Sequence, residues 1–331
     1  MAVNLTPQYH AANEQYSRAK TTEDKLQWLR AMWVELPKHK ASEKVQASLK
    51  TKISELTDEL EREKSGPRKS APGTFKFPRQ GAGQIVILGG PNAGKSRLLT
   101  RLTRATPEVA PYPFTTREPL PGMMDFEDIR IQLIDTPPIT EDMYEPFITD
   151  LTRSADAAVL LVDLGDDDGP FAVDVVLARL KEARRVLVPV RPETDDDPTV
   201  YVLPTLLVAN KSEADGAMDR LEFLKDVVGD RFPILSIDAE SGKGMDEFKA
   251  ELWKILGLMR IYSKTQGKPA DMVAPFTIPH GSNVVDFAEK IHSDLAEKVK
   301  SARVWGSAAF DGQVVGKEHI LEEKDIVELQ T

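Results

Sequence analysis

Apolar residues recur with two different periods along the 331-residue chain, and each period predicts its own kind of element. In the N-terminal part the apolar side chains lie three and four residues apart, which is typical of amphipathic helices. We expect helices at 22–36 and 42–63. Their apolar positions are Leu26, Trp28, Leu29, Met32, Trp33 and Leu36 in the first and Val45, Leu49, Ile53, Leu56 and Leu60 in the second. Because the short segment 37–41 links them, the two helices are predicted to fold back as an α-helical hairpin.

The central part alternates continuous apolar runs with helical patterns. Strands are predicted at 85–88, 129–134, 157–164, 203–209 and 232–237, and helices at 95–105, 143–153, 170–185, 216–228 and 244–257. Such alternation is typical of an α/β doubly wound sheet, whose ligands bind at the carboxyl ends of the strands. The run 129–134 alternates apolar with polar residues, so we interpret it as an edge strand.

Composition divides the chain into four parts. The segment 65–83 is rich in Pro, Gly, Lys and Arg and is typical of a linker. We therefore expect an N-terminal helical hairpin at 1–64, the linker, an α/β domain at 84–258 and a small C-terminal domain at 259–331. The C-terminal part is predicted to contain strands at 259–264, 275–279, 301–306 and 325–330 and a helix at 283–299.

Charge and cysteine content narrow the function classes. The net charge of −10 is the sum of +5 for residues 1–84, −13 for 85–259 and −2 for 260–331. An acidic central domain argues against a nucleic-acid groove there, whereas the basic N-terminal segment remains a candidate. The chain has no Cys, which excludes disulfides and thiolate metal sites. No apolar run is long enough to span a bilayer and no signal peptide is evident, so we predict a cytoplasmic protein with no membrane partner.

The first predicted strand of the α/β domain leads into a phosphate-binding pattern. The spacing Gly89-x-x-x-x-Gly94-Lys95-Ser96 follows the strand and opens a helix, as the P-loop motif requires. Small residues allow consecutive backbone N–H groups to surround a phosphate, and the helix N-terminus adds its positive dipole end. Lys95 can then reach the β- and γ-phosphates, and the Ser96 hydroxyl can bind Mg²⁺.

Further polar residues follow the other predicted strands. Asp135 comes after 129–134, where an acid can hold a Mg²⁺-bound water. Asn210, Lys211 and Glu213 come after 203–209, where a carboxylate can accept bonds from the N1–H and the exocyclic amine of a guanine base. Asp238 and Ala239 open the loop before the last helix, and a Thr116 hydroxyl could reach the metal. We interpret the acidic runs 166–168 and 195–197 as solvated loops.

Together these segments resemble the five guanine-nucleotide motifs of translation-type small GTPases. The P-loop and the segment Tyr112-Pro113-Phe114-Thr115-Thr116 are similar to those of the Obg family, particularly its developmentally regulated GTP-binding (DRG) branch. Residues 259–331 resemble the TGS domain of that branch, a small ubiquitin-like β-grasp module, and the predicted order of strands and helix agrees with it.

The resemblance implies a role for each matching residue. Phosphates would be bound by Gly89, Gly90, Pro91, Asn92, Ala93, Gly94, Lys95 and Ser96. Ser96 and Thr116 would bind Mg²⁺, and Phe114 and Thr115 would belong to switch I. Asn210, Lys211, Glu213, Asp238 and Ala239 would surround the base. Lys95, Thr116 and Asn92 are the expected catalytic residues, since an Asn at position 92 accompanies a K⁺ ion beside the phosphates in similar P-loops.

The chain departs from the family pattern at three places. Glu213 stands where the base motif has Asp, Asp238 replaces a Ser, and switch II contains Pro138 where the pattern Asp-x-x-Gly has glycine. Proline has no N–H to offer to a γ-phosphate. The family's extra inserted domain is also predicted to be absent between Asp135 and Asn210.

Three functions follow as hypotheses. The first is a slow GTPase switch that acts on ribosomes or RNA through the TGS domain and the basic helical hairpin. The second is a guanine-nucleotide-binding scaffold with little or no hydrolysis, which Pro138 favours. The third is an ATPase, which requires the Asn210-Lys211 match to be accidental. For the hairpin, the alternative to RNA docking is that its apolar faces only pack on each other and on the neighbouring domain. The oligomeric state is left open.

Overall fold

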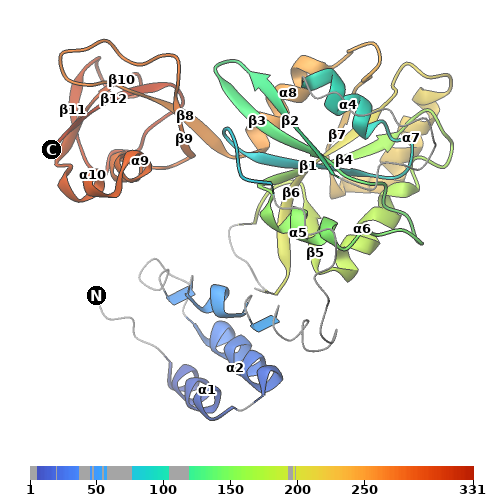
Figure 1. Ribbon diagram of the computed structural model, residues 1–331, viewed down its shortest axis with the longest axis horizontal. Helices are drawn as coiled ribbons and strands as arrows, with labels where there is room; N and C mark the ends of the chain where they lie inside the picture. Colours follow the sequence, from blue (N-terminus) through green and yellow to red (C-terminus); the bar gives the residue numbers. More distant parts are fainter. Residues whose placement is uncertain are drawn as a thin grey trace. The chain divides into compact units, whose positions relative to one another are not determined.

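The computed structural model describes residues 6–19, 21–36, 45–46, 48–53, 56–57, 77–103, 119–192, 197 and 199–331 (Figure 1). The side chains of Ser17 and Thr22 are not described. The chain forms two compact units, one of residues 1–74, 182–186 and 192–202, and one of residues 75–181, 187–191 and 203–331. Each unit is considered by itself.

The N-terminal unit contains two capped helices, α1 (Pro7–Arg18) and α2 (Thr22–Glu35). Thr6 Oγ1 accepts a 3.1 Å bond from Tyr9 N, and Thr21 Oγ1 accepts one of 3.1 Å from Asp24 N, so each helix begins at a threonine cap. The shared core consists of Tyr9, Ala12, Leu26, Leu29, Met32, Trp33, Leu36, Leu49 and Ile53. The packing thus joins three segments, because α1 adds to the two predicted helices.

Both predicted N-terminal helices are represented in that core. The prediction for 22–36 is confirmed by α2. Within 42–63, residues 45, 46, 48–53, 56 and 57 are described and helical, while the rest of that span and the link 37–41 lie outside the described residues. Helix α1 was not predicted, because its inward positions are Tyr9, Ala12 and Tyr16 rather than a stripe of large aliphatic residues.

The second unit contains a mostly parallel sheet in the order β2-β3-β1-β4-β6-β5, with β7 paired to β6, among the described residues. The strands are β1 (Gln84–Gly89), β2 (Leu120–Phe126), β3 (Ile129–Asp135), β4 (Ala157–Asp163), β5 (Arg185–Val188), β6 (Tyr201–Asn210) and β7 (Ile234–Ser236). The helices are α4 (Lys95–Leu102), α5 (Phe147–Ser154), α6 (Ala172–Glu182), α7 (Ala217–Val228) and α8 (Met245–Ile255), with a short 3-10 turn at Gly229–Arg231. Helices α4 and α8 lie on one side of the sheet and α5 and α6 on the other (Figure 1). The predicted doubly wound α/β fold is confirmed.

The prediction of an edge strand at 129–134 was wrong. Strand β3 lies inside the sheet between β1 and β2, and β2 forms the edge, antiparallel to β3. The alternation that suggested an edge comes partly from Gln132, whose side-chain Oε1 is buried in a 2.8 Å bond from Gln84 Nε2. A satisfied polar residue can occupy a central strand without access to water.

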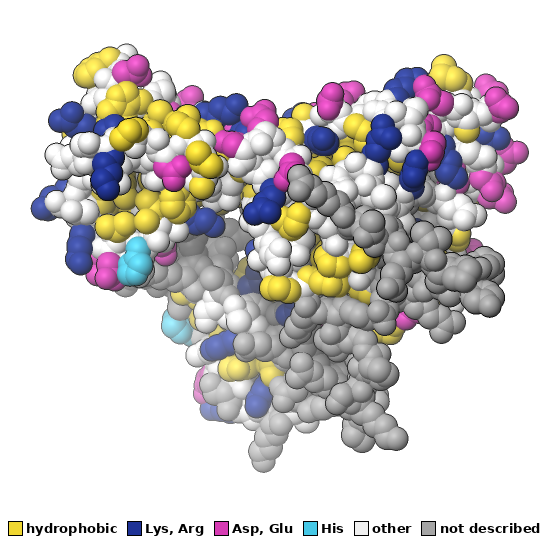
Figure 2. All heavy atoms as spheres, turned by 45° about the horizontal axis from the view of Figure 1, so that its top comes forward, with side chains coloured by type: hydrophobic (Ala, Val, Ile, Leu, Met, Phe, Trp, Pro, Cys, Tyr) yellow, Lys and Arg dark blue, Asp and Glu magenta, His cyan; other side chains and the backbone are white. Residues whose placement is uncertain are grey.

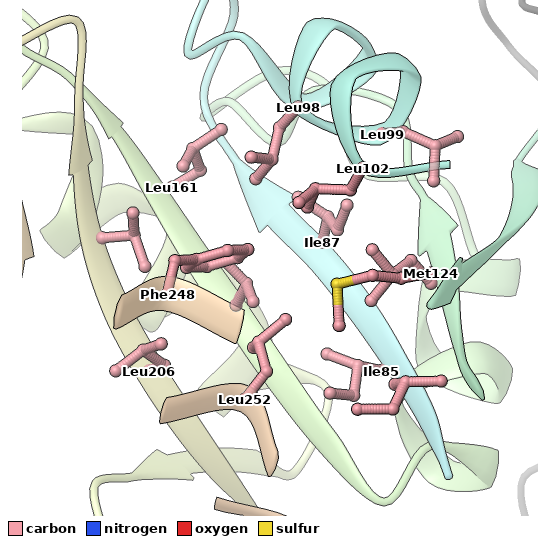
Figure 3. Packing of buried hydrophobic residues seen from close by; sticks show 14 of the residues in the cluster. Ile85, Ile87, Leu98, Leu99, Leu102, Met124, Leu161, Leu206, Phe248 and Leu252 are labelled. Carbon is pink, nitrogen blue, oxygen red and sulfur yellow. The ribbon is translucent and has the colours of Figure 1, made fainter. Parts of the chain in front are cut away.

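Buried side chains fix the start of β1 and α4 relative to each other. Ile85 and Ile87 of β1 pack against Leu98 and Leu99 of α4 and Phe248 of α8, all fully buried (Figure 3). Because this core holds the strand and the helix firmly, it also fixes the loop that joins them, residues 90–94.

The C-terminal domain is a second sheet in the order β11-β10-β12-β8-β9 among the described residues. Its elements are β8 (Leu258–Ser263), β9 (Phe276–Pro279), α9 (Val284–Ile291), α10 (Ser293–Lys298), β10 (Ser301–Trp305), β11 (Gln313–Gly316) and β12 (Asp325–Gln330). The four predicted strands are present, and β11 was missed. The predicted helix at 283–299 is divided at His292, whose ring accepts a 3.2 Å bond from Asp294 N and so begins α10. None of the helices in the described part of the chain has the length and apolarity needed to cross a membrane.

Candidate functional site

The loop after β1 has a backbone shape that only its glycines permit. Gly89 and Gly94 have φ values of +151° and +92°, in the region that favours glycine. A Cβ added to Gly89 would lie 2.4 Å from the carbonyl oxygen of Leu161, and one added to Gly94 would lie 2.4 Å from Asn210 Nδ2. The loop is thus pressed against β4 and against the end of β6. Asn92 also has a positive φ, +56°, which Asn tolerates better than most residues.

Lys95 is held inside this loop. The side chain is buried, and its Nζ donates to the carbonyl oxygens of Gly89 at 3.0 Å and Gly90 at 2.8 Å. Burial lowers its pKa to about 8, although the nearby Asp135 carboxylate opposes the shift. An ammonium group held by two neutral carbonyls can move to a phosphate anion, which is a stronger partner.

Ser96 and Asp135 meet at the carboxyl end of β3. Ser96 Oγ donates a 2.5 Å bond to Asp135 Oδ2, while Asp135 Oδ1 is buried and has no hydrogen-bond partner among the described residues. Burial raises the pKa of Asp135 despite the bond from Ser96. A half-satisfied buried carboxylate next to a hydroxyl is an oxygen-rich place that fits a hard divalent cation and its bound water.

A third group of contacts joins three loops at Asn210, which is almost fully buried. Asn210 Nδ2 donates to Ala93 O at 2.8 Å, and Asn210 Oδ1 accepts from Ala239 N at 3.0 Å. Lys211, with φ +64°, places its Nζ 2.6 Å from Asp163 Oδ2. The P-loop, the end of β6 and the loop after β7 are therefore connected by one amide side chain.

Comparisons with known proteins match both domains. Residues 84–210 match the family described as 50S ribosome-binding GTPase, and residues 259–331 match the TGS domain. Developmentally-regulated G-protein 1 of Arabidopsis thaliana is 27% identical, with 92% of this chain and 90% of the relative covered. An uncharacterized GTP-binding protein of Halobacterium salinarum is 28% identical, with 88% of this chain and 94% of that protein covered. The chain belongs to the Obg/DRG family of GTPases.

The solved structure of the Schizosaccharomyces pombe YchF GTPase agrees at the level of fold. It has a TM-score of 0.50 and 12% identity, and the alignment covers 77% of this chain and 100% of that one. On the two family matches, the chain is a GTP-binding protein with a G domain and a C-terminal TGS domain. The domain boundaries and the roles of single residues stay predictions.

The two unusual residues of the predicted base site lie together in the G domain. Asp238 accepts bonds from Glu240 N at 2.9 Å and Ser241 N at 2.8 Å, and its second oxygen lies 3.4 Å from Glu213 N. Burial raises the pKa of Asp238, but the backbone N–H donors lower it more, so the carboxyl stays ionised. The half-exposed carboxylate of Glu213 lies 3.7 Å from Lys243 Nζ. Asp238 therefore anchors the loop backbone, and the Glu213 carboxylate remains able to turn toward a base.

The segment predicted to be switch II contacts the P-loop through the residue after Pro138. Ile139 is buried, and its N–H donates a 3.2 Å bond to Gly89 O, the same oxygen that accepts from Lys95. Thr136 Oγ1 donates to Ile87 O at 2.7 Å and fixes the turn after β3. The first N–H after the proline is thus occupied by the P-loop backbone.

Most, though not all, of the predicted site residues can be placed. The P-loop residues, Asp135 and the five base-site residues lie at adjacent strand ends of one sheet, whereas Phe114, Thr115 and Thr116 lie outside the described residues. The sequence interpretation missed Asp163, the partner of Lys211. The available signal was its place near the end of the predicted strand 157–164, and in the structure it lies in register with Asn210 of β6. No cluster of three or more His, Asp and Glu side chains suited to a metal occurs in the described part of the chain.

Proposed function

We propose that this protein binds GTP and GDP and hydrolyses GTP slowly to GDP and phosphate, as a switch that engages ribosomes or other RNA. The observation that carries the nucleotide part is the bridge made by Asn210, because it assembles the phosphate loop and the base loops into one frame. In that frame the P-loop backbone and Lys95 bind the phosphates.

Ser96 and Asp135 are the described residues that would hold Mg²⁺, Asp135 through a bound water, and the predicted Thr116 would complete the site. When bound, the ion neutralises charge on the β- and γ-phosphates. Lys95 adds a further positive charge, after leaving the carbonyls of Gly89 and Gly90. Asn92 is the residue that would accompany a K⁺ ion.

Base recognition rests on Asn210, Lys211 and Glu213. The Asn210 amide holds Ala239 N at the base site, and the stem of Lys211 can lie along a base plane. Glu213 is one methylene longer than Asp and can accept from the N1–H and exocyclic amine of guanine, which adenine does not offer. We expect guanine preference with a smaller margin than an Asp would give.

The test is calorimetric binding of GTP, GDP, ATP and XTP to the purified chain, followed by phosphate release. Lys95→Ala should abolish tight binding, whereas Lys290→Ala, which removes an exposed charge on α9, should leave it unchanged. Unchanged affinity in Lys95→Ala, or tighter binding of ATP than GTP, would contradict the proposal.

A second candidate function is a nucleotide-binding scaffold without significant hydrolysis. It is favoured by Pro138, which has no N–H, and by Ile139, whose N–H is bonded to Gly89 O. In a single-turnover experiment this candidate predicts equal GTP and GDP affinities and no phosphate release above the uncatalysed level. Measurable turnover that depends on Lys95 would exclude it.

The ribosome or RNA partner is supported by the net charge of +5 in residues 1–84 and by the kind of family that the G domain matches. Basic segments bind polyanions with an affinity that falls steeply with salt. Cosedimentation with ribosomes at two salt concentrations, with and without residues 1–76, whose net charge is 14 − 10 = +4, tests this part. Equal sedimentation of both forms would remove the helical segment from the proposal.

A further inference from the structure

A buried arginine of the TGS domain binds the tip of a G-domain hairpin. Arg260 on β8 is 4% exposed, and its Nη1 lies 2.6 Å from Glu127 Oε2 and 2.8 Å from Asp128 Oδ1. Its Nε and Nη2 lie 2.7 and 2.5 Å from Glu323 Oε1, within the TGS domain itself. The guanidinium therefore joins two acids of the G domain to one acid of the TGS domain.

Other side chains surround this contact on both sides. The Tyr262 hydroxyl donates to Asp128 Oδ2, and Lys324 Nζ lies 3.0 Å from Glu127 Oε2. The Arg260 guanidinium also lies over the ring of Trp253, 5.4 Å from its centroid. We call Glu127, Asp128, Arg260, Tyr262, Glu323 and Lys324 the clamp. An arginine so enclosed is held in one geometry by directional bonds from several sides.

The backbone at two clamp residues supports a dedicated contact. Glu127 has φ +49° and Lys324 has φ +68°, a region that favours glycine or asparagine over long side chains. Glu127 and Asp128 form the connection between β2 and β3, a place where Asn-Gly is the favoured pair. Glu127 and Lys324 are instead charged residues with long side chains, and they form an ion pair between the G domain and the TGS domain.

The hairpin connects the clamp to the nucleotide site. Strands β2 and β3 pair without interruption from Phe126 opposite Ile129 to Leu120 opposite Asp135. At about 3.3 Å per residue, the clamp lies roughly 20 Å from Asp135 along one rigid hairpin. Asp135 in turn bonds Ser96 and is paired in register with Ile87 next to the P-loop. The paired strands therefore form a continuous path from the clamp to Asp135, the residue proposed to hold Mg²⁺ through a water.

We propose that Arg260 is a positioning residue for the nucleotide site, which it reaches through the β2–β3 hairpin, so that TGS docking and the binding of Mg²⁺ with GTP are energetically linked. This inference rests on the proposed guanine-nucleotide function and adds the regulation of that site. A partner that pulls the TGS domain from the hairpin weakens triphosphate binding, and the triphosphate strengthens docking by the same factor, since linkage is reciprocal.

The variant that tests this is Glu127→Gln with Asp128→Asn. It removes both carboxylates from the G domain while Arg260 keeps Glu323, so the TGS domain retains its internal pair. The matched control is Asp125→Asn with Glu318→Gln, which changes the same net charge at exposed positions outside the clamp. Affinities for GDP and for a non-hydrolysable GTP analogue with Mg²⁺ are measured by calorimetry for wild type and both variants. The emission of Trp253 is obtained as the difference between each protein and its own Trp253→Phe variant, because Trp28, Trp33 and Trp305 also emit. It reports docking, because undocking removes the Arg260 cation from the ring of Trp253 and exposes that ring to water.

We expect a red shift of Trp253 emission in the clamp variant and an affinity for the GTP analogue lowered about 5- to 10-fold, with GDP affinity changed by less than about twofold. Wild-type affinities in a variant whose emission shows undocking would overturn the proposal, and so would an unshifted emission, since the acids would then not hold the TGS domain. A wild type that binds no guanine nucleotide would overturn the proposed function and this inference with it.

Discussion

The buried Lys95 should make the stability of the nucleotide-free G domain depend on pH in an unusual direction. Its pKa is lowered from the ordinary 10.5 to about 8 by burial in the P-loop. Between these two values the unfolded chain binds more protons than the folded one. Stability must therefore rise with pH in this window, whereas below pH 8 the full cost of the buried charge is present.

The size of the effect follows from the shift. One pKa unit corresponds to 1.36 kcal/mol, so lowering the pKa from 10.5 to about 8 gives up to ~3.4 kcal/mol of stability gained from pH 8 to 10.5. Nucleotide binding should show the opposite trend. Because a phosphate needs the charged ammonium, GDP affinity should be constant below pH 8 and weaken by up to about tenfold per unit above it.

The assay is urea denaturation without Mg²⁺ or nucleotide at several pH values between 7 and 10.5, for wild type and Lys95→Met. The unfolding transition of the G domain is identified in a separate titration of the wild type, as the transition whose midpoint moves to higher urea when GDP is added. Other lysines and tyrosines titrate in the same range, and the difference between the two proteins removes their contribution. We expect the stability advantage of Lys95→Met to shrink as pH rises. Parallel curves would show that Lys95 carries no penalty in the folded state and would refute the reasoning.

Three further changes test the unusual residues of the G domain. Glu213→Asp should increase the preference for GTP over ATP, because the shorter carboxylate restores the usual fit to guanine. Competition binding measures this preference, and a reduced preference would contradict the base-site assignment. Pro138→Gly should raise the affinity for GTP analogues relative to GDP by restoring an N–H donor, and an unchanged ratio in calorimetry would argue against this role. Asn92→Ala should abolish any stimulation of phosphate release by K⁺ over Na⁺, whereas equal rates in both salts in the wild type would leave Asn92 only its backbone role, consistent with its φ of +56°.

The sequence predicted where most of the candidate site residues lie, because the patterns that contain them are local. A P-loop needs a strand, glycines and a helix within one short segment, and the backbone around Gly89 and Gly94 can be inferred from the spacing alone. The base residues were placed by a second local rule, that polar residues at the ends of parallel strands meet at one edge. Asp163 also lies at the end of a parallel strand, but it was not predicted because it belongs to none of the recognised motifs.

The features that the sequence did not predict depend on contacts between segments that are distant in the chain. Strand β2 contains Pro121 and Gly122, which weaken a strand pattern, and its place at the sheet edge is decided by pairing with β3. The clamp could not be predicted for a similar reason. Nothing near Arg260 in the chain indicates that Glu127 and Asp128, more than a hundred residues earlier, will enclose it. Lys243 likewise comes close to the Glu213 carboxylate only through the fold, since the two residues lie on different loops.

The contacts of Gly89 O bear on how the segment predicted to be switch II could respond to the nucleotide when Pro138 replaces the glycine of the family pattern. That oxygen accepts from both Lys95 Nζ and Ile139 N. When a phosphate attracts Lys95, the bond from Ile139 can remain, and it holds switch II against the P-loop backbone. Since Pro138 has no N–H for the γ-phosphate, the triphosphate has no donor at this position by which to pull switch II into a second conformation. Under the proposed function, a difference between GTP and GDP would then enter through the metal side, where Asp135, which accepts a bond from Ser96 of α4, ends the hairpin that the TGS domain holds at its tip.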